Sequence, residues 1–448
     1  MKLKNIFKYL MLGFVALSLG SCSNNTDAEQ LFDQTPTERL NAQKKELNDL
    51  LFTSEYGWKA VYFTDDTQLG GYTHLFKFLP GNKVEMASDF DSDTKTYTSD
   101  YDVVLGSTVS LLFDTYNRIH LLSDSNSYPT TALRGKGYLG DFQFLYYGQE
   151  NGDIIFKSNR LVREVRFVKA TAEDWADLSK NLITQQNLIG SSARPLFRSL
   201  DVNDGSKVMK YDFSFNVATR YVLAPSIDAG SSEVLSFGVG YTPTGIVISP
   251  AIEVAGQKLT TFLYNDTDGS FTATGTGGVT ASIKYSNSPF VLTDDYKLLL
   301  DGNPQMVFGY IAANLYTAPT TSAYFKTLIN KVNATLPANQ QITRIQLYFN
   351  SPYGTYIEYR FAGGRPSIYH TVTTSENAAN KTIVLTNDYW DNGVAIIAPP
   401  GYLAEIDAVF TNTAGLYVKK ESFRITYSNT VYTFTSAASN FRITTYQL

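Results

Sequence analysis

The sequence contains a single cysteine, Cys22, among 448 residues. Without a second cysteine the chain cannot form an internal disulfide or a metal site built from several thiolates. Histidine and tryptophan are also scarce, with three of each. The histidines are far apart and form no HExxH pattern or close pair: they are His74, His120 and His370. The chain must therefore stabilise itself by burying apolar side chains, and we predict no cofactor.

Other catalytic motifs are also missing from the sequence. There is no Gly-x-Ser-x-Gly nucleophile elbow and no Walker loop. Two carboxylates on a β scaffold can hydrolyse glycosides, but no pair stands out among 42 acidic residues. We therefore expect a protein without catalytic activity, and a glycoside hydrolase remains the enzymatic alternative.

The chain has no excess of positive charge. Its formal net charge is -5, and it becomes -8 if the three lysines of the N-terminal segment are removed. An acidic chain without a basic stripe argues against a nucleic-acid partner. Beyond the N-terminal segment there is no apolar run long enough to span a bilayer.

The N-terminal segment has the layout of a secretory signal peptide. Lys2, Lys4 and Lys8 precede an apolar run over residues 9–19, which is too short for a permanent membrane span. The following Leu19-Gly20-Ser21-Cys22 resembles the lipobox of bacterial lipoproteins. This resemblance implies that residues 1–21 are removed and that Cys22 is acylated. Several acyl chains together hold a protein firmly on a membrane.

Residues 22–34 are then predicted to be the acylated cysteine and a polar tether. Asp27 and Glu29 make the tether acidic, and this resembles the signal that sends some Bacteroidota-type lipoproteins to the cell surface. The resemblance implies an outer-membrane lipoprotein that faces the cell exterior, with a periplasmic orientation left open.

Aromatic residues make up 14% of the chain, with 31 Tyr and 28 Phe. Tyr, Phe, Thr, Val and Ile favour pleated, half-buried surfaces. Many short runs alternate apolar with polar residues and are interrupted by Gly, Asn and Asp. These features predict a mostly β fold of the α+β type.

Three helices are expected among the strands. The first begins with Thr35 as N-cap, Pro36 at the first helical position and Glu38 completing a capping box. The second begins at Thr171, and the third runs from about Thr320 to Ala334. The apolar stripe of the first helix is Leu40, Leu47, Leu50 and Leu51. That of the second is Trp175, Leu178, Leu182 and Ile183, and that of the third is Tyr324, Leu328, Ile329 and Val332.

A block of predicted strands follows each helix, and this spacing suggests an internal repeat. Each block has a strand that ends in Phe and, about 30 residues later, a Gly before an apolar strand. These landmarks are Phe78, Phe215 and Phe361, and Gly106, Gly245 and Gly393. We predict three tandem units over 35–170, 171–300 and 301–448, each a helix followed by an antiparallel meander or small barrel-like sheet. Shared β composition is the alternative to a repeat, and the choice between closed barrel and open sheet remains open.

Several segments together resemble a family of Bacteroidota-type lipoproteins of unknown function. Besides the lipobox and Thr35–Arg39, these are 56–58, 70–72, 113–120 and 140–142. Members of that family often accompany outer-membrane systems that capture glycans or peptides. The resemblance implies a surface setting for nutrient handling, and it supplies no catalytic or binding residues.

One acidic segment imitates a calcium loop. Asp89, Asp91 and Asp93 alternate, and Asp100 stands at the twelfth position, which is the arrangement of hard oxygen ligands that Ca²⁺ prefers. However, Thr94 occupies the place of the usual glycine, and the segment lies between predicted strands. A solvated acidic hairpin is the alternative.

The segment Tyr389, Trp390, Asp391 and Asn392 is the candidate ligand site. The Asn392-Gly393 pair marks a tight turn, so Trp390 is expected at or beside a loop tip. An exposed indole with Asp and Asn beside it could stack on a sugar and bind its hydroxyls. Packing of Trp390 over a sheet edge is the alternative. Trp58, which follows Gly57, is expected to join the first helix to the core.

These features predict a membrane-anchored surface lipoprotein that binds or presents extracellular ligands, first glycans and then peptides. The alternative is a structural accessory subunit docked on an outer-membrane transporter complex. A hydrolase with an unidentified carboxylate pair is the third reading. The ligand and the oligomeric state are left open.

Overall fold

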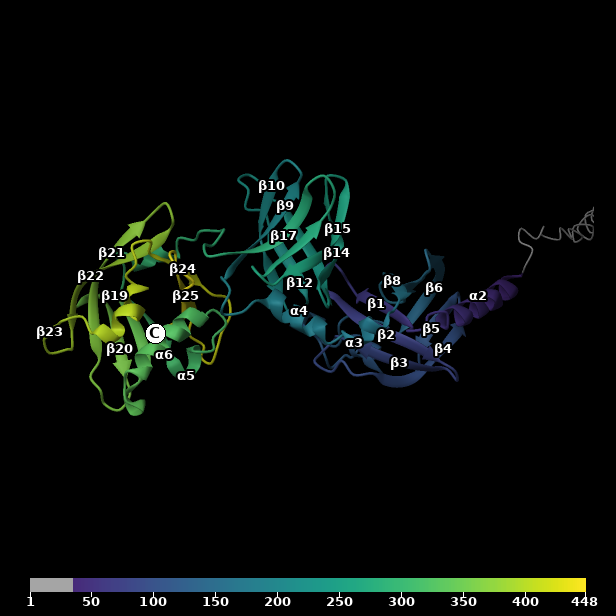
Figure 1. Cartoon of the computed structure of the whole chain (residues 1–448), viewed down its shortest axis with the longest axis horizontal. Coiled ribbons are helices and arrows are strands. Elements are labelled where there is room, and N and C mark those ends of the chain that lie inside the picture. Colours follow the sequence, from purple (N-terminus) through teal and green to yellow (C-terminus); the bar gives the residue numbers. More distant parts are fainter. Residues whose placement is uncertain (1–34) are drawn as a thin grey trace, which may run out of the picture.

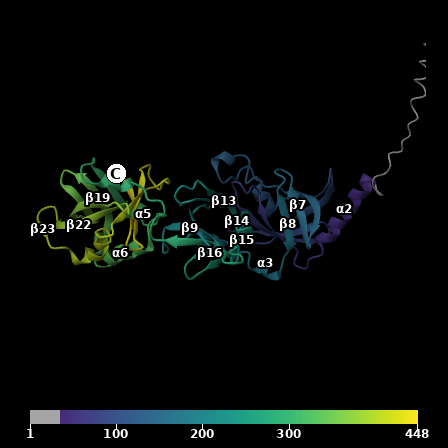
Figure 2. The ribbon, with the colours of Figure 1, turned by 90° about the horizontal axis from the view of Figure 1, so that it is seen from above.

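The computed structural model describes residues 35–448. The predicted signal peptide, Cys22 and the tether lie outside the described residues. Three β domains follow one another in a row, with helix α2 (Pro36–Leu51) at one end and strand β23 (Ile396–Ile397) at the other, in both views of the molecule (Figures 1 and 2). The predicted mostly β fold is confirmed, with three barrel-like sheets.

Helix α2 begins as its sequence predicts. The Thr35 hydroxyl accepts from the Glu38 amide at 3.3 Å, and the Glu38 carboxylate accepts from the Thr35 amide at 2.8 Å. Leu47 and Leu51 are buried against the first domain. Trp58 is also buried, and its indole nitrogen donates to the Leu51 carbonyl at 3.0 Å. This tryptophan therefore joins the helix to the first strand.

The first domain is a closed antiparallel barrel whose eight strands follow chain order, with the last strand paired to the first. Aromatic rings fill its interior: Phe76 packs on Phe113 and Phe167 at centroid distances of 5.3 and 4.7 Å. The barrel is thus a packed core. Its strands are β1 (Trp58–Phe63), β2 (Gly71–Leu79), β3 (Lys83–Ser88), β4 (Tyr97–Leu105), β5 (Val109–Phe113), β6 (Gln143–Glu150), β7 (Asp153–Ser158) and β8 (Glu164–Lys169).

The second domain begins with two short helices, α3 (Ala172–Ala176) and α4 (Lys180–Ile189), where one helix was expected. Helix α4 buries Asn181, Thr184 and Leu188, so the predicted Ile183 lies off its buried face and is exposed. The sheet runs in the order β10-β9-β17-β16-β15-β14-β13-β12-β11. Its strands are β9 (Phe197–Asp204), β10 (Val208–Asp212), β11 (Ser214–Asn216), β12 (Tyr221–Pro225), β13 (Val234–Thr242), β14 (Gly245–Val254), β15 (Gln257–Asn265), β16 (Ser270–Thr274) and β17 (Val279–Ser286).

The two ends of this second sheet nearly meet. Strands β10 and β11 are its edges, and an isolated bridge joins Tyr211 of β10 to Ser226, which directly follows β12. Strand β11 has three residues and pairs with β12. The second domain is therefore a barrel with one seam that a single bridge spans.

The third domain begins with a short 3-10 helix, Asp295–Leu299, and a strand, and its α-helices come after that strand. Strand β18 (Met306–Ile311) precedes α5 (Ala312–Leu315) and α6 (Ala323–Ala334), and it pairs with the last strand, β26 (Arg442–Gln447). Helix α6 buries Phe325, Leu328, Ile329 and Val332, so the predicted Tyr324 lies beside the buried face and is exposed. The remaining elements are β19 (Ile342–Ser351), β20 (Gly354–Phe361), β21 (Ile368–Asn377), β22 (Thr382–Asp391), β23, α7 (Ala404–Ala408), β24 (Leu416–Lys420) and β25 (Val431–Ser436).

The helix-then-strands layout thus does not describe all three domains. The predicted landmarks match between the second and third domains but not in the first. Counted along each domain, Phe78 lies in the second strand, whereas Phe215 and Phe361 lie in the third. Gly106 follows the fourth strand, while Gly245 and Gly393 come after the fifth. What the domains share is an antiparallel sheet whose first strand in the chain pairs with the last.

The first and second domains meet through a buried ion pair. The Arg220 guanidinium lies between the rings of Tyr72 and Tyr241, at 4.0 and 4.6 Å from their centroids. It donates to the Asp89 carboxylate at 3.1 Å and to the Gly71 carbonyl at 3.0 Å. The backbones also touch, because the Gly70 amide donates to the Thr219 carbonyl at 2.8 Å. A Cβ on Gly238 would lie 2.4 Å from the Leu69 carbonyl oxygen, so this approach requires glycine.

The second and third domains meet mainly through backbone groups. The Ala323 amide donates to the Ser192 carbonyl at 2.7 Å, and the Arg442 guanidinium donates to the Arg194 carbonyl at 3.0 Å. A cleft of about 250 Å³ lies between these domains, with Phe197 on one side and Tyr417 on the other.

Candidate functional site

Tyrosines gather on the outer face of the third domain. Side chains alternate between the two faces of a strand, and the pairing of β19 to β22 brings alternate residues of four strands side by side. Tyr348 pairs with Tyr356, Tyr356 with Thr371, and Thr371 with Tyr389. The next row along the strands places Tyr369 beside Asp391. The register therefore assembles an aromatic surface from tyrosines up to 41 positions apart, Tyr348 and Tyr389.

A pocket of about 550 Å³ lies over this surface. The sheet contributes Thr371 and three tyrosines, and Tyr353 comes from the turn between β19 and β20. The rest of the lining comes from Asp391 at the end of β22 and from residues 393–396, which form the loop after it and the first residue of β23. The lining tyrosines are Tyr353, Tyr356, Tyr369 and Tyr389.

The rings around the pocket are fixed to different degrees. Tyr356 stacks on Tyr348 at 4.5 Å with nearly parallel planes, and its edge meets Tyr369 at 5.9 Å. Tyr353, in contrast, is 81% exposed. Burial raises the pKa of Tyr356 to about 12. Its phenol therefore stays protonated at neutral pH and can both donate and accept a hydrogen bond.

The loop that walls the pocket is held by its own side chains. The Asn392 side-chain oxygen Oδ1 accepts from the amides of Val394 and Ala395, at 3.1 and 2.9 Å, and the Asp391 carboxylate accepts from the Gly393 amide at 2.8 Å. Gly393 has a φ of +82°, which the predicted tight turn requires. Val394 and Ile396 are left largely exposed as an apolar wall.

Two of the four predicted ligand residues, Tyr389 and Asp391, line this pocket, and two do not. Asn392 is used to shape the turn. Trp390 is 5% exposed, so the expectation of an exposed stacking platform at this residue is wrong. Strand β22 continues through Asp391, and alternation along it points Trp390 inward, between His370 at 4.2 Å and Tyr359 at 6.1 Å.

A buried polar network lies beneath the pocket. His370 Nδ1 is 2.9 Å from an Asp407 oxygen, which also accepts from the Tyr359 hydroxyl at 2.8 Å. His370 Nε2 is 2.7 Å from the Asn387 side-chain oxygen. A bulge between β21 and β22 brings Asn387 to this position. The network fixes the strands that carry Tyr369 and Tyr389, and sequence reasoning missed it because its members are distant in the chain.

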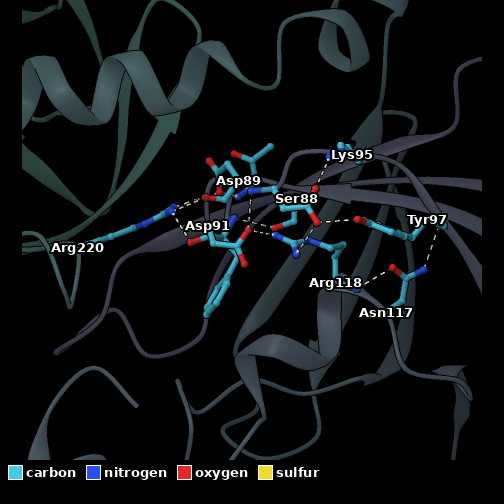
Figure 3. Close-up of polar contacts among 11 residues, drawn as sticks. Ser88, Asp89, Asp91, Lys95, Tyr97, Asn117, Arg118 and Arg220 are labelled. Atoms are coloured by element: carbon cyan, nitrogen blue, oxygen red, sulfur yellow. Dashed lines mark hydrogen bonds and ion pairs between the residues drawn. The ribbon is translucent and has the colours of Figure 1, made fainter. Parts of the chain in front are cut away.

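The predicted calcium residues do not form one cluster, because basic residues pair with them, as Figure 3 shows for Asp89 with Arg220 and Asp91 with Arg118. Asp89 turns into the junction with the second domain, where it binds Arg220 and accepts from Asn181 at 2.9 Å. Asp91 pairs with Arg118 at 2.6 Å, Asp93 lies 4.0 Å from the same guanidinium, and Asp100 pairs with Lys83. Within residues 35–448 no group of three or more His, Cys, Asp or Glu side chains is placed to hold a metal ion.

The junction between the first two domains lies inside a stretch that comparison with known families identifies. Residues 28–266 match the model of a family described as a domain of unknown function (DUF4302). The chain belongs to this family. The DUF4302 match covers the first domain and the second as far as β15, so it includes both Asp89 and Arg220. The tyrosine-lined pocket lies outside it.

Other comparisons add nothing to the DUF4302 assignment. No curated protein matches the chain. One solved structure, a DNA polymerase sliding clamp from Bacillus subtilis, aligns with 9% identity over 91% of this chain and 96% of its own, at a TM-score of 0.14. A score this low carries no argument about fold or function. In the part of the chain that the structure describes, no helix has the length and apolar character needed to cross a membrane.

Proposed function

We propose that this chain is a membrane-anchored, non-catalytic binding protein that holds an extracellular glycan in the tyrosine-lined pocket of its third domain. The observation that carries the proposal is the pocket itself. Four tyrosines from three strands and a turn converge there, with Thr371 and Asp391 between them. Flat rings beside a few polar groups suit a ligand that has both apolar C–H faces and hydroxyls.

The charge of the pocket favours a neutral glycan. Among the described residues that line it, Asp391 is the one with a charged side chain. A carboxylate can accept hydrogen bonds from sugar hydroxyls, whereas it would repel an anionic ligand. An extended peptide with aromatic or apolar side chains is the second choice.

The same lining argues for binding rather than hydrolysis. Glycoside hydrolysis ordinarily uses two carboxylates on either side of the scissile bond. Asp391 has no second carboxylate opposite it in the lining, and the nearby Glu358 is buried and bonded to Arg360 at 2.7 Å. The geometry thus offers recognition groups without an acid–base pair.

The position of the pocket fits an anchor at Cys22. Helix α2 stands at one end of the row of domains, and the pocket loop beside β23 stands at the other (Figure 1). A lipid anchor that precedes α2 would place the pocket at the far end of the molecule from the membrane. This arrangement would suit a surface lipoprotein that captures ligands outside the cell.

The proposal is tested by glycan binding to the soluble chain from Ser23 to Leu448. We expect at least one neutral glycan on an array to bind, and Tyr356→Ala to weaken it about fivefold or more, because a lost stacked ring costs about 1 kcal/mol. Tyr324→Ala is the matched control, since Tyr324 is exposed on α6 of the same domain and outside the pocket.

Two outcomes would contradict the proposal. Either no glycan binds, or Tyr356→Ala and Tyr324→Ala bind as the wild type does. In both cases the alternative function, docking on an outer-membrane transporter, would be favoured. The exposed apolar side chains of Val394 and Ile396 would then be the candidate docking surface.

A further inference from the structure

A second pocket lies on the first barrel, and none of its residues takes part in the proposed function. It has a volume of about 270 Å³. Its walls come from the loop after β3, the start of β4 and the segment after β5, so two stretches of chain about 20 residues apart meet there. The residues that matter are Asp93, Tyr97, Thr98, Tyr116, Asn117 and Arg118.

Arg118 forms the polar floor of this pocket. The residue is 8% exposed, and its guanidinium is held by Asp91 at 2.6 Å and lies 4.0 Å from Asp93. Its Nε has no hydrogen-bond partner among the described residues. A buried donor without a partner costs free energy, and the ion pairs with Asp91 and Asp93 offset that cost. Figure 3 shows this guanidinium between Asp91 and the side chains of Tyr97 and Asn117.

Asn117 fixes the geometry of the floor. Its side-chain amide donates to the Tyr97 carbonyl at 3.2 Å and to the Ser99 hydroxyl at 2.8 Å, while its oxygen accepts from the Arg118 amide at 2.7 Å. One buried residue thus joins the two stretches of chain. The pocket is therefore a formed site and not a gap between loops.

Exposed rings flank the floor. Tyr97 is 43% exposed and donates its hydroxyl to Asp93 at 2.7 Å, and Tyr116 is 67% exposed. The Tyr116 ring lies 5.6 Å from His120, which stacks on the 41% exposed Phe142 at 4.7 Å. Three rings therefore form a strip that leads away from the pocket.

The strip carries no charge at neutral pH. His120 accepts from the Asn117 amide at 3.2 Å, and its other nitrogen lies 3.2 Å from the Phe113 carbonyl. Burial lowers the pKa of His120, so the ring stays neutral. The neutral His120 ring can therefore pack between Tyr116 and Phe142 as an aromatic side chain.

We infer that this pocket and its aromatic strip form a second binding site for a neutral saccharide. The two aspartates already balance Arg118, so the site has no net positive charge to attract an anion, while donors and acceptors stand beside flat rings. The inference rests on the first barrel alone and goes beyond the third-domain pocket. The chain would then hold glycans at two sites with the second domain between them.

The test uses the soluble chain in which Tyr356→Ala and Tyr389→Ala have removed the third-domain pocket. The probes are a mixed-linkage β-glucan, a xylan, an α-mannan and an anionic pectin, with gel retardation as the readout. We expect this background to bind at least one neutral polysaccharide and not pectin. Adding Tyr116→Ala should weaken that binding at least tenfold.

Two further variants keep the result interpretable. Thr98→Trp should block the pocket sterically with a similar loss, since Thr98 is exposed in its lining. Tyr147→Ala should change nothing, because Tyr147 is 55% exposed on the same barrel and does not line the pocket. Thermal melting checks that each variant is folded.

The outcomes separate the two sites. If the background binds no polysaccharide while the wild type does, the second site is overturned and the third-domain pocket stands. If Tyr116→Ala and Thr98→Trp bind as the background does, the second site is also overturned. If Tyr116→Ala abolishes binding in the wild type and the third-domain changes have no effect, the second site stands and the function proposed for the third domain falls.

Discussion

The two junctions between domains are built differently. Between the first and second domains a fully buried arginine is inserted between two tyrosine rings and bonded to an aspartate of the neighbouring domain. Between the second and third, Arg442 is also buried, but it donates to carbonyl oxygens and not to a carboxylate. Burial alone lowers the pKa of Arg442 to about 10. A buried charge with a matched partner is specific for one arrangement, so we expect the first junction to be the rigid one.

The extent of the family match agrees with this difference. The matched residues, 28–266, include both partners of the first junction, whereas of the second junction they include only the second-domain side, Ser192 and Arg194. We therefore expect the first two domains to form the larger unit, joined to the third domain by weaker contacts. The following predictions test whether these two junctions differ in energy as they differ in chemistry.

The largest effect is expected from Arg220→Ala. The change leaves Asp89 buried without its charge partner, and breaking a buried pair in this way costs about 3–5 kcal/mol. Chemical denaturation should show this loss in the free energy of unfolding of the first two domains. Lys258→Ala is the control, because its pair with Glu253 is exposed and should contribute about 1 kcal/mol or less.

A second arm of the same experiment removes both charges together. Arg220→Met with Asp89→Leu should be more stable than Arg220→Ala, since no charge is then left unpaired. Equal effects of Arg220→Ala and Lys258→Ala would mean that the junction is not a cooperative part of the fold.

The next effect is expected from Trp390→Ala. Trp390 is buried between His370 and Tyr359, and truncating a buried tryptophan costs about 3–5 kcal/mol. If the third domain unfolds separately, calorimetry should show one transition moving to lower temperature while the transition of the first two domains stays in place. A common shift of all transitions would show that the second junction is as tight as the first.

The smallest effect is expected on acidification, through His74. This residue is fully buried in the first barrel, neither ring nitrogen has a partner among the described residues, and burial lowers its pKa to about 3. The unfolded chain, with a pKa near 6.5, binds the proton between those values while the folded chain does not. Stability is therefore lost as the pH falls below 6.5, by about 3 kcal/mol at pH 4.

The measurement compares the wild type with His74→Phe between pH 7 and pH 4. The variant should lose less stability over this range in the transition of the first two domains, and the third-domain transition should be the same in both proteins. Parallel acid profiles for the two proteins would exclude His74 as the cause.

Local chemistry made part of the fold predictable from the sequence. The Thr35–Glu38 capping box lies within four residues, and the structure contains it as predicted. The β class follows from alternation and composition in the same way. The third domain's first strand was missed because β18 closes on β26, about 140 residues later, and no local pattern reports such a pairing.

The site was only half predictable for a related reason. The Asn392-Gly393 turn is present as predicted. Its presence did not imply that the neighbouring Trp390 is exposed, and Trp390 is buried. Alternation along β22 would have separated Tyr389 and Asp391 from Trp390, since the strand runs to Asp391. Tyr356 and Tyr369 could not be found, because their place beside Tyr389 depends on strand register. The pairing of Asp89 with Arg220, 131 residues apart, was equally out of reach.

The seam of the second barrel has a consequence for chains at high local concentration. An unpaired strand edge is a template for pairing with another molecule, and high local concentration increases that risk. The first barrel has no edge, and the second exposes its edges only at β10 and the three-residue β11. Lys210 and Asp212 add charge along β10, and the bridge from Tyr211 to Ser226 draws that edge inward. Densely packed copies should therefore stay separate and soluble instead of joining into sheets.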